Sequence, residues 1–302
     1  MKHFTDISEI EKSEIENILI DAIELKKSNI KTNNYLKGKN LILLFEKTST
    51  RTRLSFDIAI KQLDGISTIL NSNDIHLASG KETIEDTIKT FGLYSDGIIM
   101  RVNNHETILK SANISEIPVI NALSNVSHPC QCMAGMMTLI EEKGSLHGLN
   151  IVWMGPITNV THSWIEAYLK DLGFNFTIFC PSEWTKKYLN KLKEYEISLN
   201  INEIVKSTID EKTLSKADVI MTDTWQSMGD QYKSNELSIL NEFKVTNSIM
   251  NSAKKESIFM HCLPANRNQE VEKEVIDGSQ SRVWQEASNR LHVQKQILKN
   301  YI

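Results

Sequence analysis

The stretch NLILLFEKTSTRTRLSF, residues 40–56, carries an apolar run directly into a cluster of hydroxyl and guanidinium groups. Its first six residues form a continuous apolar segment, as in strands that are buried on both faces of a parallel sheet. The residues after the cluster have helical spacing, and those we expect on the helix are Leu54, Ile58 and Gln62 with Phe56, Ile60 and Leu63. A strand that turns into a helix is the building unit of parallel α/β domains.

The same unit recurs along the chain. The runs that we predict as strands are Asn40–Phe45, Gly97–Val102, Pro118–Leu123, Asn150–Gly155, Phe176–Cys180, Val219–Trp225 and Ser257–Leu263. Helical patterns lie between them, including a capping box from Ser13 to Glu16 and a tail that starts at Trp284. The alternation predicts two doubly wound α/β domains with parallel sheets, joined by helices, with a break near residues 137–149.

Composition excludes several classes of protein. With 302 residues, 40% of them hydrophobic and 24% charged, the chain has the profile of a globular protein of about two domains. A net charge of −4 gives no overall attraction for nucleic acid or an anionic membrane. We see no secretory signal and no run of about 20 apolar residues. The cysteines are too scattered for a disulfide framework, so we expect a cytoplasmic protein: Cys130, Cys132, Cys180 and Cys262.

Polar clusters follow the predicted strands at or just past their C-terminal ends. The clusters are STRTR, Arg101, SHPCQ, GPITN, DTWQSMGD and HCLPAN. In parallel α/β sheets this edge is the one that binds ligands. Exposed loops would explain one or two such clusters, but not two arginines, two histidines and an aspartate at one edge. The pattern therefore predicts a ligand site.

The cluster Ser49–Arg53 indicates an anion site. Hydroxyls and backbone N–H groups at a helix N-terminus bind anions, and Arg51 or Arg53 can add a bidentate pair to phosphate. A capped helix with solvated arginines would give the same local pattern. Neither G-x-x-x-x-G-K-[ST] nor G-x-G-x-x-G occurs, which argues against a nucleoside triphosphate or a dinucleotide. A small phosphorylated molecule fits better.

Histidine and cysteine side chains gather in two clusters, which contain His128, Cys130, Cys132, His261 and Cys262. H-x-C-x-C lacks the C-x-x-C loop of structural zinc sites, so we expect no metal. His128 beside Gln131 suits hydrogen bonding to a substrate, although a structural, half-buried histidine fits the residue alone equally well. Asp223 could hold an ammonium group, and without further information a plain turn aspartate is the simpler interpretation.

Taken in order, these motifs resemble the aspartate/ornithine carbamoyltransferase family. S-T-R-T-R and H-P-x-Q are similar to the motifs of the whole family, and D-x-W-x-S-M-G and H-C-L-P to those of its ornithine branch. The likeness runs from KHFTDISE to NRLHVQKQIL, nearly the whole chain. It implies transfer of a carbamoyl group from carbamoyl phosphate to the δ-amine of L-ornithine, which gives citrulline and phosphate.

The resemblance also implies site residues. Those similar to the family's carbamoyl phosphate cradle are Ser49, Thr50, Arg51 and Thr52. Those similar to the carbamoyl-end residues are Arg101, His128, Pro129, Cys130 and Gln131, and Arg290 resembles the arginine that closes over this ligand. Those matching the ornithine-holding residues are Asn159, Asp223, Ser227 and Met228, while Cys262 and Leu263 match the pair placed between the substrates. The catalytic residues would be Arg101, His128, Asp223 and Cys262.

The family likeness further implies a carbamoyl phosphate-binding domain at 1–142 and an ornithine-binding domain at 143–283. The helix at 284–302 would pack back on the first domain. It implies a homotrimer or an assembly of trimers with sites between subunits. It also implies no metal, organic cofactor, nucleic acid or membrane. His76, in the loop that would reach a neighbouring subunit, stands where relatives usually have glutamine.

Other departures concern Pro156 and Thr158 in GPITN and Gly135 in MAGMM. They leave two rival functions open: a carbamoyltransferase for another amine, such as putrescine or an acylated ornithine, and a non-catalytic ligand-binding paralogue. The S-M-G loop favours free ornithine, and the retained charged residues favour catalysis. A nucleotide-binding Rossmann protein is disfavoured by the missing glycine fingerprint.

Overall fold

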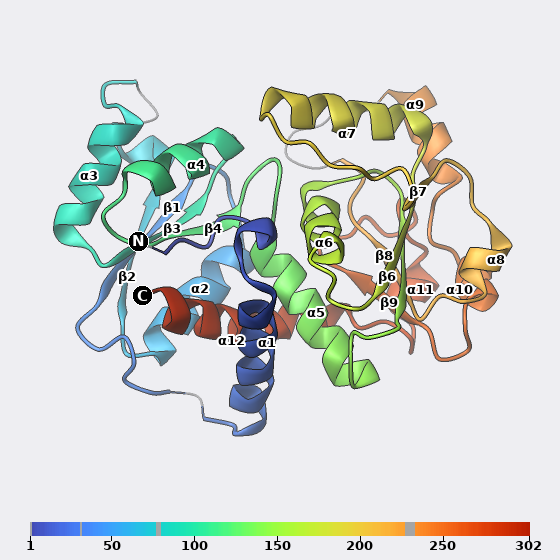
Figure 1. The fold of residues 1–302 in the computed structure, drawn as a ribbon, viewed down its shortest axis with the longest axis horizontal. Coiled ribbons are helices and arrows are strands. Elements are labelled where there is room, and N and C mark those ends of the chain that lie inside the picture. Colours follow the sequence, from blue (N-terminus) through green and yellow to red (C-terminus); the bar gives the residue numbers. More distant parts are fainter. Residues whose placement is uncertain (1, 31, 77–79, 227–232) are drawn as a thin grey trace. The chain divides into compact units, whose positions relative to one another are not determined.

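The computed structural model describes residues 2–30, 32–76, 80–226 and 233–302 (Figure 1). The chain divides into two compact units. Unit 1 comprises Met1–Met137 and Ser288–Ile302, and unit 2 comprises Thr138–Ala287. Each unit contains one parallel sheet, which confirms the predicted fold class. The domain limits 1–142 and 143–283 stay a prediction. In the described ranges, no helix is both long and apolar enough to cross a membrane.

The sheet of unit 1 is doubly wound. Its strands are β1 (Asn40–Phe45), β2 (Ile66–Asn71), β3 (Gly97–Arg101) and β4 (Val119–Leu123). They are all parallel and lie in the order β2-β1-β3-β4. From β1 the chain moves outward to β2, then returns to the other side of β1 for β3 and β4. The winding direction therefore reverses between β1 and β3, which is where α/β sheets open a crevice for ligands.

Helices cover both faces of this sheet (Figure 1). They are η1 (Ile7–Glu9), α1 (Lys12–Lys27), α2 (Arg51–Gln62), η2 (Ser72–Asp74), α3 (Ile84–Tyr94), α4 (His105–Ile114), α5 (Pro129–Lys143) and α12 (Val283–Tyr301). Phe91 of α3 and Ile108 of α4 pack on the face that carries Ile42 and Leu44. Helices α5 and α12 each contain a position at which the two units divide.

The C-terminal helix α12 packs against the N-terminal part of unit 1, as predicted. Lys26 Nζ of α1 donates to Asn289 Oδ1 at 2.7 Å, and Gln296 Nε2 donates to the carbonyl of Asp21 at 3.1 Å. The last residue, Ile302, comes so close to Gly97 of β3 that a side chain there would collide with it.

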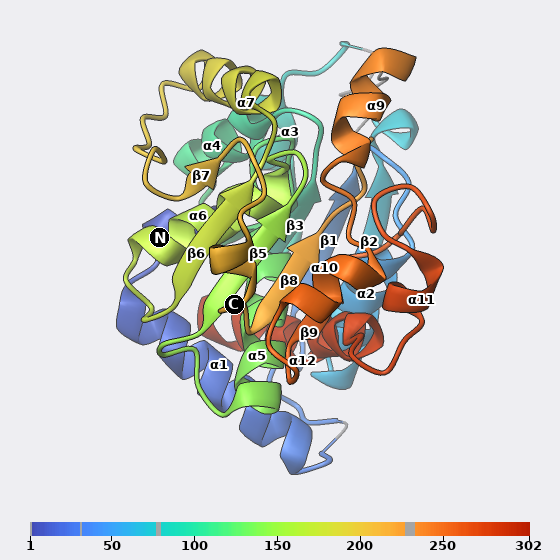
Figure 2. The same ribbon diagram turned by 90° about the vertical axis from the view of Figure 1, so that its right-hand side faces the viewer.

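The sheet of unit 2 is also doubly wound. Its strands are β5 (Asn150–Met154), β6 (Asn175–Phe179), β7 (Val205–Lys206), β8 (Val219–Thr222) and β9 (Ile258–His261), in the parallel order β7-β6-β5-β8-β9. The remaining helices are α6 (Asn159–Leu169), α7 (Ser182–Glu194), α8 (Glu211–Leu214), α9 (Ser234–Asn241), α10 (Asn247–Ser252) and α11 (Lys273–Ile276) (Figures 1 and 2). Leu214, Met250 and Val275 bring α8, α10 and α11 into one buried cluster with Phe259 of β9. The winding direction reverses between β5 and β8.

One local prediction was wrong, and two predicted helices carry exposed apolar residues. Helix α1 begins at Lys12 behind Glu11, which makes no side-chain cap, so no capping box forms from Ser13 to Glu16. Leu54 and Ile58 are 52% and 39% exposed. Because α2 buries Thr52, Phe56, Ala59 and Ile60, residues two positions away point to the opposite side. Trp284 lies in the first turn of α12, where a helical tail was predicted, and is 70% exposed.

Candidate active site

Residues that follow or end three strands lie at the carboxyl edge of the sheet in unit 1. The turn after β1 leads into α2 with Thr52 in its first turn, and Arg101 is the last residue of β3. β1 and β3 are the neighbours between which the winding reverses. His128 follows β4 at the start of α5. The predicted alignment of polar clusters along one edge is therefore present in this unit.

Two guanidinium groups converge on the hydroxyl of Thr52, which is buried. Arg101 Nη1 donates to Thr52 Oγ1 at 3.1 Å, and Arg290 Nη2 donates to the same oxygen at 2.8 Å. Arg290 Nη1 donates to Gln131 Oε1 at 3.1 Å, so this guanidinium bridges α2 and α5. Arg290 and Gln131 are 3% and 1% exposed. Such a concentration of buried positive charge suits an anionic ligand, because a charge is costly to bury without a counter-charge.

His128 is held as a neutral imidazole. Burial lowers its pKa well below 6.5, and the positive charges of Arg290 and Arg101 lower it further. The first turn of α5 fixes its backbone, because the N–H of Gln131 donates to the carbonyl of His128 at 3.1 Å. A neutral imidazole beside two guanidinium groups can donate a hydrogen bond to an oxygen without requiring a proton from solvent.

The residues just before Thr52 lie at the N-terminus of α2. Thr50 occupies the N-cap position without a side-chain cap, and Ser49 and Arg51 are half-buried. The free backbone N–H groups and the helix dipole favour a bound anion at this point. The alternative of a capped helix with solvated arginines is matched in part, because Arg53 is exposed but Thr50 makes no side-chain cap.

Cys130 is fully buried in the same motif, and Pro129 opens α5. The Cys130 thiol donates to the carbonyl of Asn121 at 3.5 Å, and burial raises its pKa to about 12. The thiol therefore supports the loop as a neutral group. Any contribution of Pro129 and Cys130 to ligand binding would come through the backbone.

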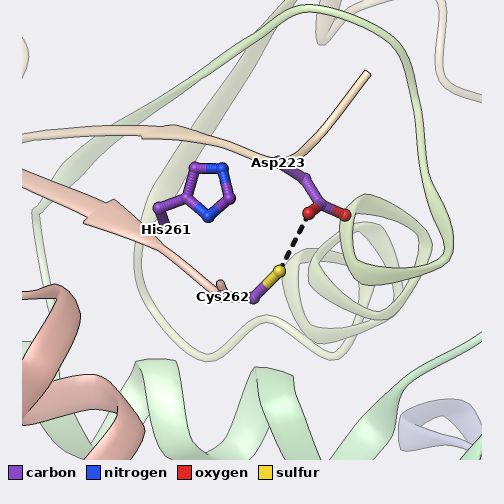
Figure 3. A group of neighbouring side chains, drawn as sticks. All are labelled: Asp223, His261 and Cys262. Atoms are coloured by element: carbon purple, nitrogen blue, oxygen red, sulfur yellow. Dashed lines mark hydrogen bonds between the residues drawn. The ribbon is translucent and has the colours of Figure 1, made fainter. Parts of the chain in front are cut away.

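A second group of side chains lies at the carboxyl edge of the sheet in unit 2. Asp223 follows β8 and Cys262 follows β9 (Figure 3). The thiol of Cys262 donates to Asp223 Oδ1 at 2.9 Å, and the same oxygen accepts the N–H of Thr224 at 2.7 Å. Asp223 is 3% exposed, unlike an ordinary turn aspartate. A buried carboxylate with a thiol donor can receive an ammonium group of a ligand.

Asp223, His261 and Cys262 carry potential metal ligands within 4.8 Å of one another. However, His261 Nδ1 accepts the N–H of Leu263 at 2.9 Å, and its Nε2 lies 3.4 Å from Glu270 Oε1. The imidazole would lose one of these contacts on binding a metal. These contacts hold His261 in the turn at Leu263 and leave Asp223 and Cys262 as the pair whose side chains face each other.

Comparison with known proteins identifies the family. The model of the aspartate/ornithine carbamoyltransferase carbamoyl-P binding domain matches residues 2–141, and that of the Asp/Orn binding domain matches residues 147–300. The chain belongs to the aspartate/ornithine carbamoyltransferase family. The family implies carbamoyl phosphate as the ligand of unit 1.

Relatives of this family match along the full chain. The ornithine carbamoyltransferase of Rhodopseudomonas palustris (strain BisA53) is 40% identical over 304 residues, covering 98% of this chain and 96% of the relative. That of Bradyrhizobium diazoefficiens is 41% identical over 300 residues, with 98% and 96% coverage. The solved ornithine carbamoyltransferase of Pyrococcus furiosus has a TM-score of 0.87 at 37% identity and covers 98% of this chain and 96% of its own.

The GPITN loop places Asn159, a predicted ornithine-holding residue, at a helix start. Asn159 is the first residue of α6 and is 7% exposed. The Thr158 hydroxyl accepts the N–H groups of Val160 at 3.2 Å and Thr161 at 3.4 Å, so this departure from the family pattern serves as the helix cap. Gly155 has φ +106°, and a side chain on it would press against the indole of Trp225.

Three further predicted residues are His76, Ser227 and Met228. His76 is exposed after η2, and Ser227 and Met228 lie outside the described residues. Sequence reasoning considered His261 only as a metal ligand and did not single out Glu270, although both are buried and support the turn at Leu263. Gly135 lies buried in α5.

Proposed function

We propose that this chain transfers the carbamoyl group of carbamoyl phosphate to the δ-amine of L-ornithine, giving L-citrulline and phosphate. The observation that carries the proposal is the pair of guanidinium groups on Thr52, in a chain about 40% identical over its full length to ornithine carbamoyltransferases. The coarser conclusion, a carbamoyltransferase that uses carbamoyl phosphate, follows from the family.

In this mechanism unit 1 holds the donor. The phosphate group lies at the N-terminus of α2, where Ser49, Thr50 and Arg51 donate to its oxygens. Thr52, Arg101 and His128 donate to the carbamoyl oxygen, on which negative charge grows as the amine attacks. Preorganised donors of this kind supply the largest contribution in many acyl transfers. Arg290 holds Gln131 and Thr52 in register, as it does in the structure.

The acceptor amine must lose its proton before it attacks. An alkyl ammonium has a pKa of about 10.4, so the free base costs roughly 4 to 5 kcal/mol at pH 7. Asp223 binds and orients the amine, and Cys262, whose thiol donates to that carboxylate, completes the pocket for the amine. Asn159, Ser227 and Met228 hold the amino-acid end of ornithine, and the carbonyl of Leu263 accepts from the carbamoyl NH2.

The bond changes follow from these contacts. The neutral δ-nitrogen attacks the carbamoyl carbon, a C–N bond forms, and the C–O bond to phosphate breaks; the nitrogen then gives up one proton, which ends on the departing phosphate as HPO4²⁻. The departing phosphate keeps the electron pair and is stabilised by Arg51 and the helix N-terminus. Holding both reactants in line supplies much of the remaining acceleration.

The test is a citrulline assay on the purified protein with ornithine, N-acetylornithine and putrescine as acceptors. Ornithine should give carbamoylated product and phosphate in equal amounts, at a rate far above that with the other two amines. Arg51→Ala should lower kcat/KM for carbamoyl phosphate by roughly 10- to 100-fold, because a charged hydrogen-bond donor is lost. A higher rate with another amine would mean that this amine, and not ornithine, is the acceptor. Failure to form product with any of the three amines would refute catalysis.

We also propose that the active form is a cytoplasmic homotrimer, or an assembly of trimers, in which the loop around His76 contributes to a neighbouring subunit's site. Exposure of His76 and the four free cysteines are consistent with this proposal. We expect this form of the protein to bind neither nucleic acid nor membrane. Light scattering on the eluted protein should give three chain masses or a multiple of three, and a monomer with full activity would refute it.

A further inference from the structure

A serine, a histidine and an aspartate form a buried series in unit 1, next to the site of carbamoyl phosphate. His105 Nδ1 lies 2.9 Å from Ser124 Oγ, and His105 Nε2 lies 3.4 Å from Asp6 Oδ2. Their exposures are 2% for His105, 0% for Ser124 and 5% for Asp6. The three residues come from the start of α4, the loop after β4 and the N-terminal segment.

The order of the three groups is that of a hydrolase triad, but its chemistry is not available here. Ser124 is fully buried, so no substrate carbonyl can reach its hydroxyl. Its oxygen is occupied by the backbone, accepting the N–H of Ser127 at 3.1 Å and that of Val126 at 3.3 Å. A hydroxyl that closes a loop in this way acts as a structural acceptor and not as a nucleophile.

The loop closed by Ser124 is the one that ends at His128. Besides its contacts to the Ser124 hydroxyl, the loop is held by a hydrogen bond of 2.9 Å from the N–H of Ser124 to the carbonyl of Ser127. Asn125 Oδ1 accepts the N–H of His105 at 2.9 Å. The loop is thereby tied at two points to the start of α4, four residues after Arg101 at the end of β3.

The N-terminal segment fixes the other end of the series. The N–H of Phe4 donates to the carbonyl of Val119 at 2.9 Å, and the N–H of Asn121 donates back to the carbonyl of Phe4 at 2.7 Å. The side-chain amide of Asn121 donates to the carbonyl of Thr5 at 2.8 Å and to Ser127 Oγ at 2.9 Å. Residues 4 and 5 therefore run beside β4 and carry Asp6 to His105.

We infer that Asp6, His105 and Ser124 are positioning residues that hold the His128–Gln131 turn in register with Arg101. The inference rests on the proposed function. The contacts of the three residues reach the segment 124–127 and the start of α4, which adjoin the carbamoyl end of the site, whereas Ser49–Thr52 belong to the turn after β1 and the N-terminus of α2. Loss of the series should disturb recognition of the carbamoyl group and leave recognition of phosphate in place.

The test compares two ligands on the full-length protein: carbamoyl phosphate, measured by calorimetric titration, and inorganic phosphate, measured as an inhibitor competing with it. In Ser124→Ala the Kd of carbamoyl phosphate should rise at least about tenfold, as expected when several hydrogen bonds of the loop are lost. The inhibition constant of phosphate should change by less than about twofold. The control is Ile108→Val on α4, which loses a buried methyl group and stability but no hydrogen bond.

A second pair keeps the test decisive if Ser124→Ala does not fold. Asp6→Asn retains an oxygen that can accept from His105 and should stay near wild type, whereas Asp6→Ala should show the same split between the two ligands. The inference would be overturned if the affinities for carbamoyl phosphate and phosphate fell equally, or if Ile108→Val changed them as much as Ser124→Ala does. Either result would mean that the three residues contribute only to the stability of the fold. Unchanged affinity for carbamoyl phosphate would also overturn it. Wild-type protein that forms no citrulline would contradict the proposed function instead.

Discussion

Replacing Asp223 by asparagine removes one negative charge from unit 2 and leaves its shape unchanged. In the wild type, Asp223 Oδ1 accepts the N–H of Thr224 at 2.7 Å and the thiol of Cys262 at 2.9 Å, and the amide oxygen of asparagine can accept both hydrogen bonds. The variant should therefore fold like the wild type. What it lacks is the carboxylate that we expect to receive the δ-ammonium group of ornithine.

The size of the effect follows from the kind of bond that is lost. A hydrogen bond to a charged group contributes about 1.5 to 3 kcal/mol, and 1.36 kcal/mol corresponds to a factor of ten. The KM of ornithine should therefore rise roughly 10- to 150-fold. The KM of carbamoyl phosphate should change by less than about threefold, because its proposed ligands belong to unit 1.

The assay is initial-rate citrulline formation with each substrate varied at saturation of the other. Asp218→Asn is the matched control, because Asp218 precedes the same strand β8 and pairs with Lys254 Nζ at 2.7 Å, at the end opposite to Asp223. This control should leave both KM values unchanged. Equal rises for both substrates in Asp223→Asn would mean that Asp223 does not hold ornithine, and an effect of Asp218→Asn on ornithine would mean that the loss is not local.

Three further predictions concern other parts of the site. The single nitrogen of lysine in Arg290→Lys cannot bridge Gln131 and Thr52. The kcat/KM for carbamoyl phosphate should therefore fall at least about tenfold at unchanged melting temperature. Full activity of this variant would show that the bridge is dispensable. Thr158→Ala should lose the cap of α6 and about 1 kcal/mol, lowering Tm by about 2 to 4 °C, while Thr158→Ser should keep both. Because the pKa of His128 is lowered in the fold, the unfolded chain binds the extra proton below pH 6.5, and stability falls as pH falls through that range. The measurement is the free energy of unfolding in urea at pH 7 and at pH 5.5. The difference between the two values should be smaller in His128→Gln than in the wild type, and an equal difference would contradict a neutral His128.

Strands with mostly apolar sequences were predictable, including the edge strands β4 and β9, whereas the edge strands β2 and β7 were not. The prediction Asn40–Phe45 coincides with β1, because both faces of that strand are covered and its sequence is apolar throughout. β2, with the sequence ISTILN, was missed. It pairs only with β1 at the edge of the sheet, so its side chains are half-exposed and polar residues are allowed. β7 has two residues and leaves too short a pattern to detect.

The site was predictable where a motif stands at a strand end, and not where distant segments meet. Arg101, His128 and Asp223 could be found because each follows an apolar run. Asp6, His105 and Ser124 carry no such signal, since a single buried polar residue does not reveal its partner. Their contact depends on the N-terminal segment lying along β4, which is a tertiary feature. The cap formed by Thr158 was likewise interpreted only as a departure from the family pattern.

Calorimetric titration of the purified protein with carbamoyl phosphate tests the central claim most directly. We predict saturable binding of one molecule per chain, with the heat lost in Arg51→Ala and retained in Asp223→Asn. Absence of binding heat at several temperatures, or equal loss in both variants, would contradict the claim that residues around Thr52 hold the donor independently of the acceptor site.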